Sequence, residues 1–410
     1  MATRIAASSG TSPVTRREFP PGVAARLVAA TVVGRVTRAA AWTRQALQSE
    51  ASDLPEAAHS QAEAITYGTI RRLLTIDPLI DALIGKRRLQ NRVKDVLRVG
   101  VWEIGWSHTP PPVAVSTAVE SIRASHPGAT GFVNAVLRQV ANGIPPESRS
   151  QQLALPEWVV KELDQEWGPE ETAAFAMSSL DDAQVGVRHR PGSPPPDGQP
   201  VPAIESAYIV EAEAVGNHPL QDPASVAVGI ALAMEPGMKA LDLAAAPGGK
   251  TLHILDLGGP TSQVVAVDRH RRRVATARRR VPDAHWVVAD GRQPPLRGSF
   301  DRILVDAPCS GLGTLRRRPE IRHRVTAAEV ERLAQTQREM LAAAMRLLAP
   351  NGRLVYSVCT VLSQETVSVV EDFPTMTPVT LPGRAWGGGW MLGPHLSATD
   401  GMFIAVLGHD

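Results

Sequence analysis

The sequence predicts an α/β protein in which an all-helical domain precedes a parallel, doubly wound sheet. In the first part of the chain, apolar residues recur at the three- to four-residue spacing of amphipathic helices, without strand-like alternation. From about residue 219 onward, short β-branched runs alternate with helical segments, the pattern of parallel strands joined by crossover helices. The length of 410 residues allows two or three domains.

The helical domain is expected to span residues 23–145, after a flexible arm at residues 1–22 that is rich in Ser, Thr, Arg and Pro. Two apolar runs each mark one face of a helix: Val93, Val96, Leu97, Gly100, Val101 and Ile104, then Phe132, Val133, Val136, Leu137 and Val140. A connecting subdomain is expected at residues 146–218, with one helix at 156–167 and a Pro- and Gly-rich loop at 191–202.

The α/β domain is expected to span residues 219–410. Its candidate strands lie at residues 239–243, 264–267, 286–289, 302–305 and 353–358. Thr326 and Glu329 have the spacing of a capping box, which predicts that a helix begins there. Because the apolar periodicity continues through Leu348, this helix is expected to end at residues 350–352, a Pro-Asn-Gly sequence.

Composition restricts the class of protein. Two cysteines in so long a chain exclude a disulfide scaffold and fit a reducing cytoplasm. No apolar signal-peptide core opens the chain, and the longest apolar run, residues 224–234, is too short to span a bilayer. A soluble, cytoplasmic protein without membrane contact is therefore expected. Arginines cluster at 271–273, 278–280 and 316–318, which indicates either a phosphate-binding face or merely a solvated surface.

A glycine pair stands between the first strand of the sheet and the helix that follows it. Glycines there let backbone N–H groups approach a ligand at the helix N-terminus. The loop lacks the first glycine of a phosphate-binding P-loop, and the dinucleotide fingerprint Gly-x-Gly-x-x-Gly is absent. What remains is an S-adenosylmethionine loop, made of Ala244, Ala245, Ala246, Pro247, Gly248, Gly249 and Lys250.

Three aspartates follow successive strands and complete the expected cofactor site. Asp268 stands where an acidic side chain takes ribose hydroxyls, and Asp290 is placed to accept a hydrogen bond from the adenine amino group. Asp306, after the fourth strand, lies at the same edge. A single aspartate after a strand is more often a cap or turn residue. Three such residues in consecutive strand-to-helix turns favour a Rossmann-like S-adenosylmethionine methyltransferase sheet. No metal site is expected.

The two cysteines of the chain follow the fourth and fifth strands. Cys309 ends Asp306-Ala-Pro-Cys, and Cys359 ends Ser357-Val-Cys. Loops at the carboxyl ends of parallel strands share one crevice, so both thiols are expected beside the cofactor loop. A lone cysteine is usually a small buried apolar residue. That role does not explain why both cysteines of the chain lie at the same edge of the sheet.

Methylation of carbon 5 of cytosine explains why a thiol is needed. That carbon becomes nucleophilic only after a thiolate has added to carbon 6, and the thiolate is eliminated later. A free thiol has a pKa of about 8.5, so a nearby positive charge must lower it, and Lys250 and the cofactor sulfonium are candidates. Asp306 is expected to hydrogen-bond the amino and ring-nitrogen edge of the cytosine. The chemistry leaves open which thiol attacks.

These motifs resemble the RsmB/Fmu (Sun) family of bacterial ribosomal RNA 5-methylcytosine methyltransferases, across nearly all of the chain. The methyltransferase half carries Gln221-Asp222-Pro-Ala-Ser225, Ala245-Ala-Pro-Gly-Gly-Lys-Thr251, Asp306-Ala-Pro-Cys309, Arg316-Arg317, Tyr356-Ser357, Cys359, Glu365 and Asp400-Gly401 with Phe403. The helical half resembles the RNA-binding NusB domain, most clearly in Gly131-Phe-Val-Asn-Ala-Val-Leu-Arg138.

The resemblance implies roles that the residues alone do not decide. Cys359 would be the nucleophile and Cys309 would help to release the product. S-adenosylmethionine would be the cofactor, small-subunit ribosomal RNA the substrate, and the sheet would have seven strands. The sequence departs from the family pattern at Arg318, Glu320 and His323, at 187–189, and at Ala244, a position often held by cysteine. The first two departures bear on which nucleotide is recognised.

Other functions remain as alternatives. A non-catalytic RNA-binding factor could dispense with either cysteine or Lys250, yet all three are present. Methyltransferases of exocyclic amines or proteins carry an Asn/Asp-Pro-Pro-Tyr/Phe motif after the fourth strand and no cysteine. DNA cytosine enzymes place the nucleophile in a Pro-Cys motif there, and DNA is not expected as a partner. Another RNA, such as tRNA, could replace ribosomal RNA. The helical domain could also serve only for packing or dimerisation.

Overall fold

The chain divides into two compact units, Met1–Ala154 and Leu155–Asp410, in a computed structural model that describes residues 19–143, 148–376 and 381–409. Most of the arm expected at residues 1–22 lies outside the described residues. Its last two residues, Pro21 and Gly22, already belong to the first helix. Of the connecting subdomain expected at 146–218, residues 155–218 group with the second unit.

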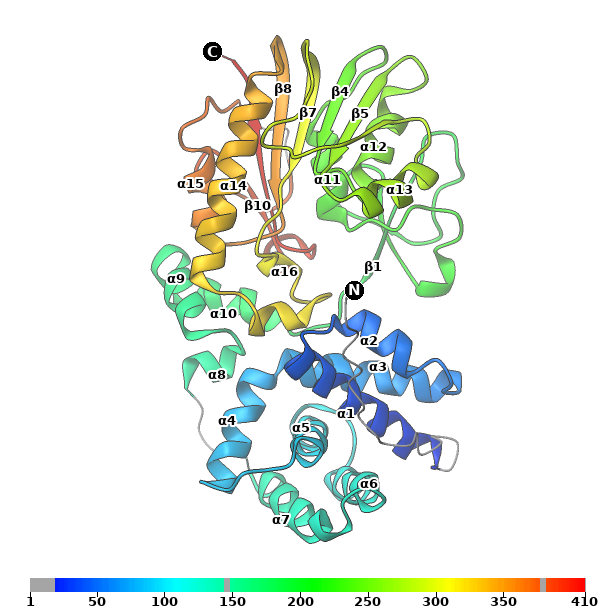
Figure 1. Cartoon of the computed structure of the whole chain (residues 1–410), viewed down its shortest axis with the longest axis vertical. Coiled ribbons are helices and arrows are strands. Elements are labelled where there is room, and N and C mark those ends of the chain that lie inside the picture. The colour runs from blue at the N-terminus through cyan, green and yellow to red at the C-terminus, as the bar shows by residue number, and fades with distance from the viewer. Residues whose placement is uncertain (1–18, 144–147, 377–380, 410) are drawn as a thin grey trace, which may run out of the picture. The chain divides into compact units, whose positions relative to one another are not determined.

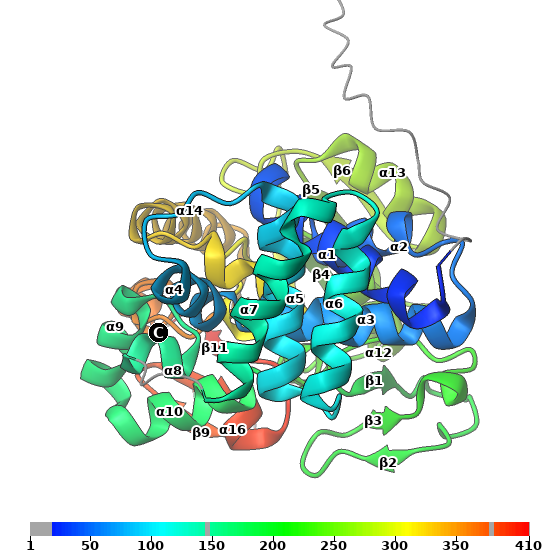
Figure 2. The ribbon, with the colours of Figure 1, turned by 90° about the horizontal axis from the view of Figure 1, so that it is seen from below.

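The first unit is helical throughout its described residues, as predicted (Figures 1 and 2). Its helices are α1 (Pro21–Ala39), α2 (Thr43–Glu50), α3 (Glu56–Arg71), α4 (Leu73–Ile84), α5 (Asn91–Trp106), α6 (Pro111–Arg123), α7 (Thr130–Ala141) and α8 (Arg149–Leu153), with a 3-10 turn at Pro127–Ala129. The predicted apolar faces are those of α5 and α7, and Val96, Leu97, Val133 and Leu137 are buried in one core cluster.

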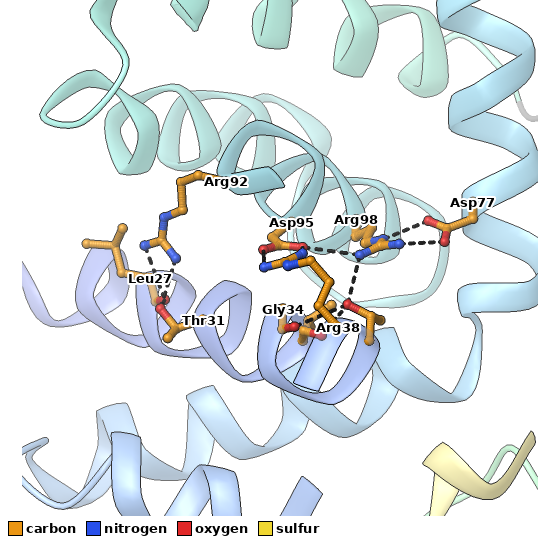
Figure 3. A network of polar contacts seen from close by, with 10 residues as sticks. Leu27, Thr31, Gly34, Arg38, Asp77, Arg92, Asp95 and Arg98 are labelled. Carbon is orange, nitrogen blue, oxygen red and sulfur yellow. Dashed lines mark hydrogen bonds and ion pairs between the residues drawn. The ribbon is translucent and has the colours of Figure 1, made fainter. Parts of the chain in front are cut away.

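An ion-pair network around the buried Asp95 and Arg98 joins α1, α4 and α5 (Figure 3). The Arg38 guanidinium donates to both carboxylate oxygens of Asp95, at 2.8 and 2.7 Å, and Arg98 donates to Asp95 at 3.1 Å. Arg98 also binds both oxygens of Asp77, at 2.7 and 2.6 Å. Removing one partner of such a pair leaves an uncompensated buried charge. These arginines therefore fix the packing of the helices.

The second unit is built on a sheet that has eight strands among its described residues, in the order β6-β5-β4-β7-β8-β11-β10-β9. Strands are β4 (Lys239–Leu243), β5 (Gln263–Asp268), β6 (His285–Val288), β7 (Phe300–Asp306), β8 (Leu348–Val358), β9 (Arg384–Trp386), β10 (Gly389–Leu392) and β11 (Met402–Leu407). The first five in this order pair in parallel, as predicted, but β11, β10 and β9 pair antiparallel. The sheet is therefore mixed, with one strand more than the seven expected.

Helices cover both faces of this sheet. On one face, helices α11 (Pro223–Ala231) and α12 (Gly249–Gly258) contribute to a core cluster that also contains Val264, Leu304 and Val355. On the other face, the Tyr356 hydroxyl donates to the Gln337 side chain of α14 (Ala327–Met345) at 3.1 Å. Adjacent residues of a strand point to opposite faces, so α14 and α11 lie on opposite sides of β8. The remaining helices are α13 (Arg271–Arg280), α15 (Val367–Val370) and α16 (Pro394–Ser397), and 3-10 turns lie at Leu312–Thr314, Pro319–His323 and Ser363–Glu365.

Helix α14 begins as predicted and ends earlier. The Thr326 hydroxyl accepts a hydrogen bond from the Glu329 backbone N–H, which caps the first turn. The helix ends at Met345, whereas the apolar spacing had placed its end at residues 350–352. Leu348 instead begins β8 and pairs with Phe300 of β7. The prediction was wrong because a buried leucine such as Leu348 fits a strand as well as a helix.

The segment before the large sheet is more regular than expected. Besides α9 (Glu157–Trp167), which matches the predicted helix, it contains α10 (Pro169–Ser178), a 3-10 turn at Ala212–Ala214 and a small antiparallel sheet. That sheet has the order β1-β3-β2, formed by β1 (Val185–Arg188), β2 (Gln199–Pro200) and β3 (Ala207–Val210). None of the helices within the described residues is long and apolar enough to cross a membrane.

Candidate active site

The candidate site lies where β4, β7 and β8 end. These strands are neighbours in the sheet and run parallel, so the loops that follow them meet at one edge. The predicted cofactor loop follows β4. The Asp-Ala-Pro-Cys motif begins with Asp306, the last residue of β7, and Cys359 comes directly after β8. The fold therefore gathers the proposed reactive groups at the carboxyl edge.

The two thiols meet at this edge. The sulfur atoms of Cys309 and Cys359 lie 3.4 Å apart, although fifty positions separate the residues in the chain. Both are free cysteines and both are partly buried. This confirms the prediction that parallel strands would bring the thiols together. At this distance one thiol can donate a hydrogen bond to the other sulfur, which makes the two chemically different.

The pKa values of the two thiols move in opposite directions. The hydrogen bond from Cys309 lowers the pKa of Cys359, although burial and the Asp306 carboxylate oppose this change, and Lys250 and Arg318 add to it. The same hydrogen bond, together with burial, raises the pKa of Cys309 well above its ordinary value. Of the two thiols, Cys359 therefore loses its proton first, and Cys309 keeps its proton.

Asp306 connects the cofactor loop to β8. Its carboxylate accepts a hydrogen bond from the Lys250 ammonium group at 2.8 Å and another from the Ser357 hydroxyl at 2.8 Å. Although burial opposes the charged form of Lys250, the Asp306 carboxylate raises the pKa of that lysine. The lysine thus stays protonated, and its charge stabilises both a carboxylate and a neighbouring thiolate.

Glu365 links the two loops that carry the cysteines. Its buried carboxylate accepts hydrogen bonds from the Ser310 backbone N–H at 2.8 Å, from the Ser310 hydroxyl and from the Thr360 hydroxyl at 3.0 Å. Ser310 follows Cys309 in the chain, and Thr360 follows Cys359. A fourth donor, the Gln337 amide of α14, reaches the same carboxylate at 3.1 Å. One side chain therefore fixes both loops relative to each other.

The predicted cofactor loop forms a sharp turn into α12. Ala244 and Gly248 both have positive φ, 63° and 98°. Asp268 at the end of β5 accepts hydrogen bonds from the Ala246 N–H at 3.2 Å and from the His270 N–H at 2.8 Å. This carboxylate holds the loop as well as standing at the predicted ribose position. A Cβ added at Gly249 would meet no atom within 4 Å, so the loop is open there.

Asp242, inside β4, is a site residue that the sequence reasoning missed. Its carboxylate is fully buried, and one oxygen accepts a hydrogen bond from Thr251 of α12 at 2.6 Å while the other has no partner. Burial raises the pKa of Asp242 to about 7. An acidic residue inside a buried strand was the available signal. An unpartnered buried carboxylate oxygen next to the loop fits a cofactor that carries an ammonium group.

Asp290 follows β6, and its carboxylate is already hydrogen-bonded to a neighbouring arginine. Its carboxylate accepts hydrogen bonds from the Arg292 guanidinium, the shortest at 2.7 Å, and these bonds lower the pKa of Asp290. Arg292 also pairs with Glu339 at 3.4 Å. A contact of Asp290 with an adenine amino group stays a prediction. Groups of three or more acidic, histidine or cysteine side chains that could hold a metal ion are absent from the described residues.

Two arginines of the 316–318 cluster form internal ion pairs, whereas Arg318 is exposed. Arg316 pairs with Asp400 at 3.2 Å, and Arg317 binds both Asp400 and Asp222 at 2.8 Å. Arg316 is buried, and the two arginines tie the segment after β7 to the residues just before β11 and α11. Arg316 is therefore neither a phosphate-binding nor a solvated surface residue, and a phosphate contact of Arg317 stays a prediction. Side chains in ion pairs of this kind are committed to the fold.

Comparison with known proteins shows the family of this chain. Residues 229–408 match the family model of the 16S rRNA methyltransferase RsmB/F, and residues 23–142 match that of the NusB family. A ribosomal RNA small subunit methyltransferase B from Thermus thermophilus is 33% identical, with 87% of this chain and 90% of that protein covered. The corresponding protein of Vibrio cholerae is 30% identical over 85% and 89%. The chain belongs to the RsmB/F methyltransferase family.

Members of the RsmB/F family use S-adenosylmethionine, which is the cofactor of this protein. Solved structures agree on the fold. A chain named PH0851 has a TM-score of 0.74 at 23% identity and covers 95% of this chain and 99% of its own length. A methyltransferase homologue from Pyrococcus horikoshii has a TM-score of 0.56 at 22% identity, covering 64% and 97%. These structures share the fold of this chain, and its helical residues 23–142 match the NusB family.

Proposed function

We propose that this protein methylates carbon 5 of a cytosine in RNA through a transient covalent bond between Cys359 and the base. The observation that carries the proposal is the pair of sulfur atoms 3.4 Å apart beside the cofactor loop. Methylation of an amine or an oxygen needs no thiol. A pair of thiols with opposite pKa shifts fits a reaction that needs both a nucleophile and a proton-bearing partner.

The first step is the attack of the Cys359 thiolate on carbon 6 of the cytosine. A sulfur–carbon bond forms, the double bond between carbons 5 and 6 opens, and the electron pair becomes available at carbon 5. S-adenosylmethionine, when bound, supplies the electrophilic methyl group that carbon 5 takes. Lys250, Gly248, Gly249, Asp242 and Asp268 are the residues proposed to hold it. The lowered pKa of Cys359 increases the fraction of this thiol that is present as the reactive thiolate.

Release of the product reverses the covalent step. Carbon 5 loses its proton to solvent, the double bond re-forms, and the sulfur–carbon bond breaks with the electron pair returning to Cys359. Cys309, which keeps its proton because its pKa is raised, is placed to donate a hydrogen bond to the departing sulfur. The developing thiolate is thereby stabilised, which supports the assignment of Cys309 to product release.

Asp306 is proposed to orient the base. Each carboxylate oxygen can accept more than one hydrogen bond, so Asp306 can bind the cytosine amino group while Lys250 and Ser357 hold it in place. As the ring takes up electrons, this contact and the nearby lysine charge stabilise the changed ring. Lys250 therefore serves both the cofactor loop and the base.

We infer that the substrate is RNA, and small-subunit ribosomal RNA in particular. The family model and the curated relatives are named for that substrate. The NusB-like residues 23–142 support an RNA partner as well. The domain limits proposed here are 23–145 for the NusB-like part and 219–410 for the methyltransferase part.

The test combines bisulfite sequencing of ribosomal RNA with the variant Cys359→Ala. In cells that lack the gene, bisulfite sequencing of ribosomal RNA is expected to show the loss of methylation at one or a few cytosines, restored by the wild-type gene. Cys359→Ala is expected to restore none of it while binding S-adenosylmethionine with an unchanged Kd, because the thiol forms no part of the cofactor loop. Normal methylation by this variant would refute the proposed roles.

A further inference from the structure

Helix α13 carries a dense positive charge that the proposed chemistry does not use. Six of its ten residues are arginines and none is acidic. The buried face of the helix is small, formed by Val274 and Ala277. With 3.6 residues per turn, Arg272 and Arg279 project away from that face, and the other four arginines flank them. The solvent side of α13 therefore carries arginines at both ends of the helix, with the exposed Ala275 and Thr276 between them.

Five of these arginines have no partner within the part of the chain that the structure describes. The side chains of Arg271, Arg272, Arg278, Arg279 and Arg280 are exposed and make no hydrogen bond or ion pair there. Arg273 alone is engaged, with Asp268 at 3.7 Å and with the Ala246 carbonyl group. Elsewhere arginines are neutralised, as Arg316 and Arg317 are by Asp400 and Asp222.

The arrangement is unfavourable for an isolated helix. Three arginines stand in the first turn, where the positive end of the helix dipole favours acidic side chains, and no acidic residue is present there. Each of these charges repels the positive end of the helix dipole. Within the described residues, Asp268, paired with Arg273 at 3.7 Å, offsets only part of this repulsion. A bound polyanion would compensate it.

The position of α13 places such a polyanion near the thiols. The helix begins three residues after Asp268, at the carboxyl end of β5. Figure 1 shows it beside α12, along the side of the sheet where β5 runs. In the order β5-β4-β7-β8, three inter-strand steps of about 4.8 Å separate β5 from the strand that precedes Cys359. Arg273 also ties the helix to the cofactor loop.

We propose that the exposed arginine face of α13 binds the sugar–phosphate backbone of the RNA substrate next to the nucleotide that is methylated. The proposal rests on the proposed function, since it assumes an RNA substrate. Arginine forks match phosphate oxygens in geometry and stay charged at all relevant pH values. Arg272 and Arg279, two turns apart on the outermost line of the helix, are the principal contacts. The binding is independent of base sequence and positions the strand.

The experiment compares two full-length double variants that lose the same charge. Arg272→Gln/Arg279→Gln changes the proposed surface, and Arg332→Gln/Arg346→Gln changes exposed arginines on and just after α14, on the opposite face of the sheet. The Kd for a transcript of 16S ribosomal RNA is measured over a range of salt concentrations. The α13 variant is expected to bind about tenfold more weakly at moderate salt. Its log Kd should depend on log salt with a slope smaller by about 1.4–1.8, which corresponds to two lost phosphate contacts.

The control variant is expected to bind RNA as the wild type does, and the cofactor Kd should be unchanged in both. Equal RNA affinity and equal salt slope in the two variants would overturn the inference. It would also be overturned if the α13 variant lost binding only to vesicles containing phosphatidylserine, which would assign the surface to a membrane. If the wild type itself neither bound nor methylated the transcript, the proposed function would fail, a result distinct from the failure of the α13 surface.

Discussion

At the scale of single residues, the central feature is the unequal pair of thiols. One hydrogen bond between Cys309 and Cys359 has opposite effects on the two pKa values, because it stabilises the charged form of the acceptor and the protonated form of the donor. A nucleophile and a leaving-group stabiliser thus arise from identical side chains. Their different roles come from position, which is why the sequence alone left the attacking thiol undecided.

This inequality predicts a pH dependence. The pKa of Cys359 is lowered, so its thiolate persists at pH values where an ordinary thiol is protonated, and reactivity is lost only as the pH falls through that lowered pKa. Cys309→Ala removes the hydrogen bond and should raise the pKa of Cys359. The rate of iodoacetamide alkylation of Cys359, followed by peptide mass spectrometry, should then drop several-fold at neutral pH. An unchanged pH profile in this variant would contradict the role given to the hydrogen bond.

At the scale of elements, the five strands that position the site could be predicted because β-branched runs end at motif residues. Asp306 and Cys359 stand at such ends, and the structure brings them to one edge. The antiparallel strands β9 and β10 were missed because short runs with Gly and Trp give little periodicity. Strand β11 was also missed, although its six residues form a continuous apolar run. The end of α14 was misplaced because Leu348 suits a helix and a strand equally.

The parts of the site that escaped prediction depend on contacts between distant segments. Asp242 gains its raised pKa from burial, which follows from packing and not from its neighbours in the chain. Glu365 was visible as a family residue without a role. Its role is visible only when the loops after β7 and β8 lie side by side, because its donors come from Ser310, Thr360 and Gln337.

Glu365 therefore gives a prediction at the scale of the two loops. In Glu365→Gln, an amide nitrogen replaces one acceptor oxygen and faces hydroxyl or N–H donors, so the cysteine loops lose part of their common anchor. A displacement of the thiols by about 1 Å is expected to lower kcat on the order of a hundredfold. The Kd for S-adenosylmethionine should stay unchanged, because Glu365 makes no contact with the loop after β4.

The matched control for this prediction is Glu371→Gln, which alters an exposed carboxylate just after α15. It should leave kcat and the pH–rate profile as in the wild type, whereas Glu365→Gln should also shift that profile through Cys359. Loss of kcat without any change in the pH profile would reduce Glu365 to a purely structural residue. Equal kcat values for the two variants would show that Glu365 does not position the thiols.

At the scale of the whole molecule, the net charge does not show which arginines form internal ion pairs and which are free to bind a ligand. The chain has 43 basic and 41 acidic residues, a formal net charge of only +2. Arg38, Arg98, Arg316 and Arg317 are used in internal ion pairs. The arginines of α13 are left unpaired within the described residues. Counting clusters in the sequence could not separate these two uses, because pairing depends on partners up to 95 positions away, as for Arg317 and Asp222.

Each of the two units also has its own apolar cores, which fits a division of labour within one chain. One cluster in the first unit centres on Ile76, Leu97 and Leu137. In the second unit, Val226, Leu304 and Val355 belong to the main cluster, on the face of the sheet that carries α11. The sequence placed the boundary near residue 145, and the structure places it after Ala154. The difference arises because α8 packs against α4 of the first unit.

The most direct measurement is a search for the covalent protein–RNA complex with the full-length chain. Cys309→Ala, incubated with S-adenosylmethionine and 16S ribosomal RNA, should accumulate a complex that survives denaturing electrophoresis, since methyl transfer proceeds and release is slowed. Adding Cys359→Ala to the same chain should abolish that complex. A complex of equal yield in the double variant, or none in Cys309→Ala, would contradict the claim that Cys359 bonds to the base.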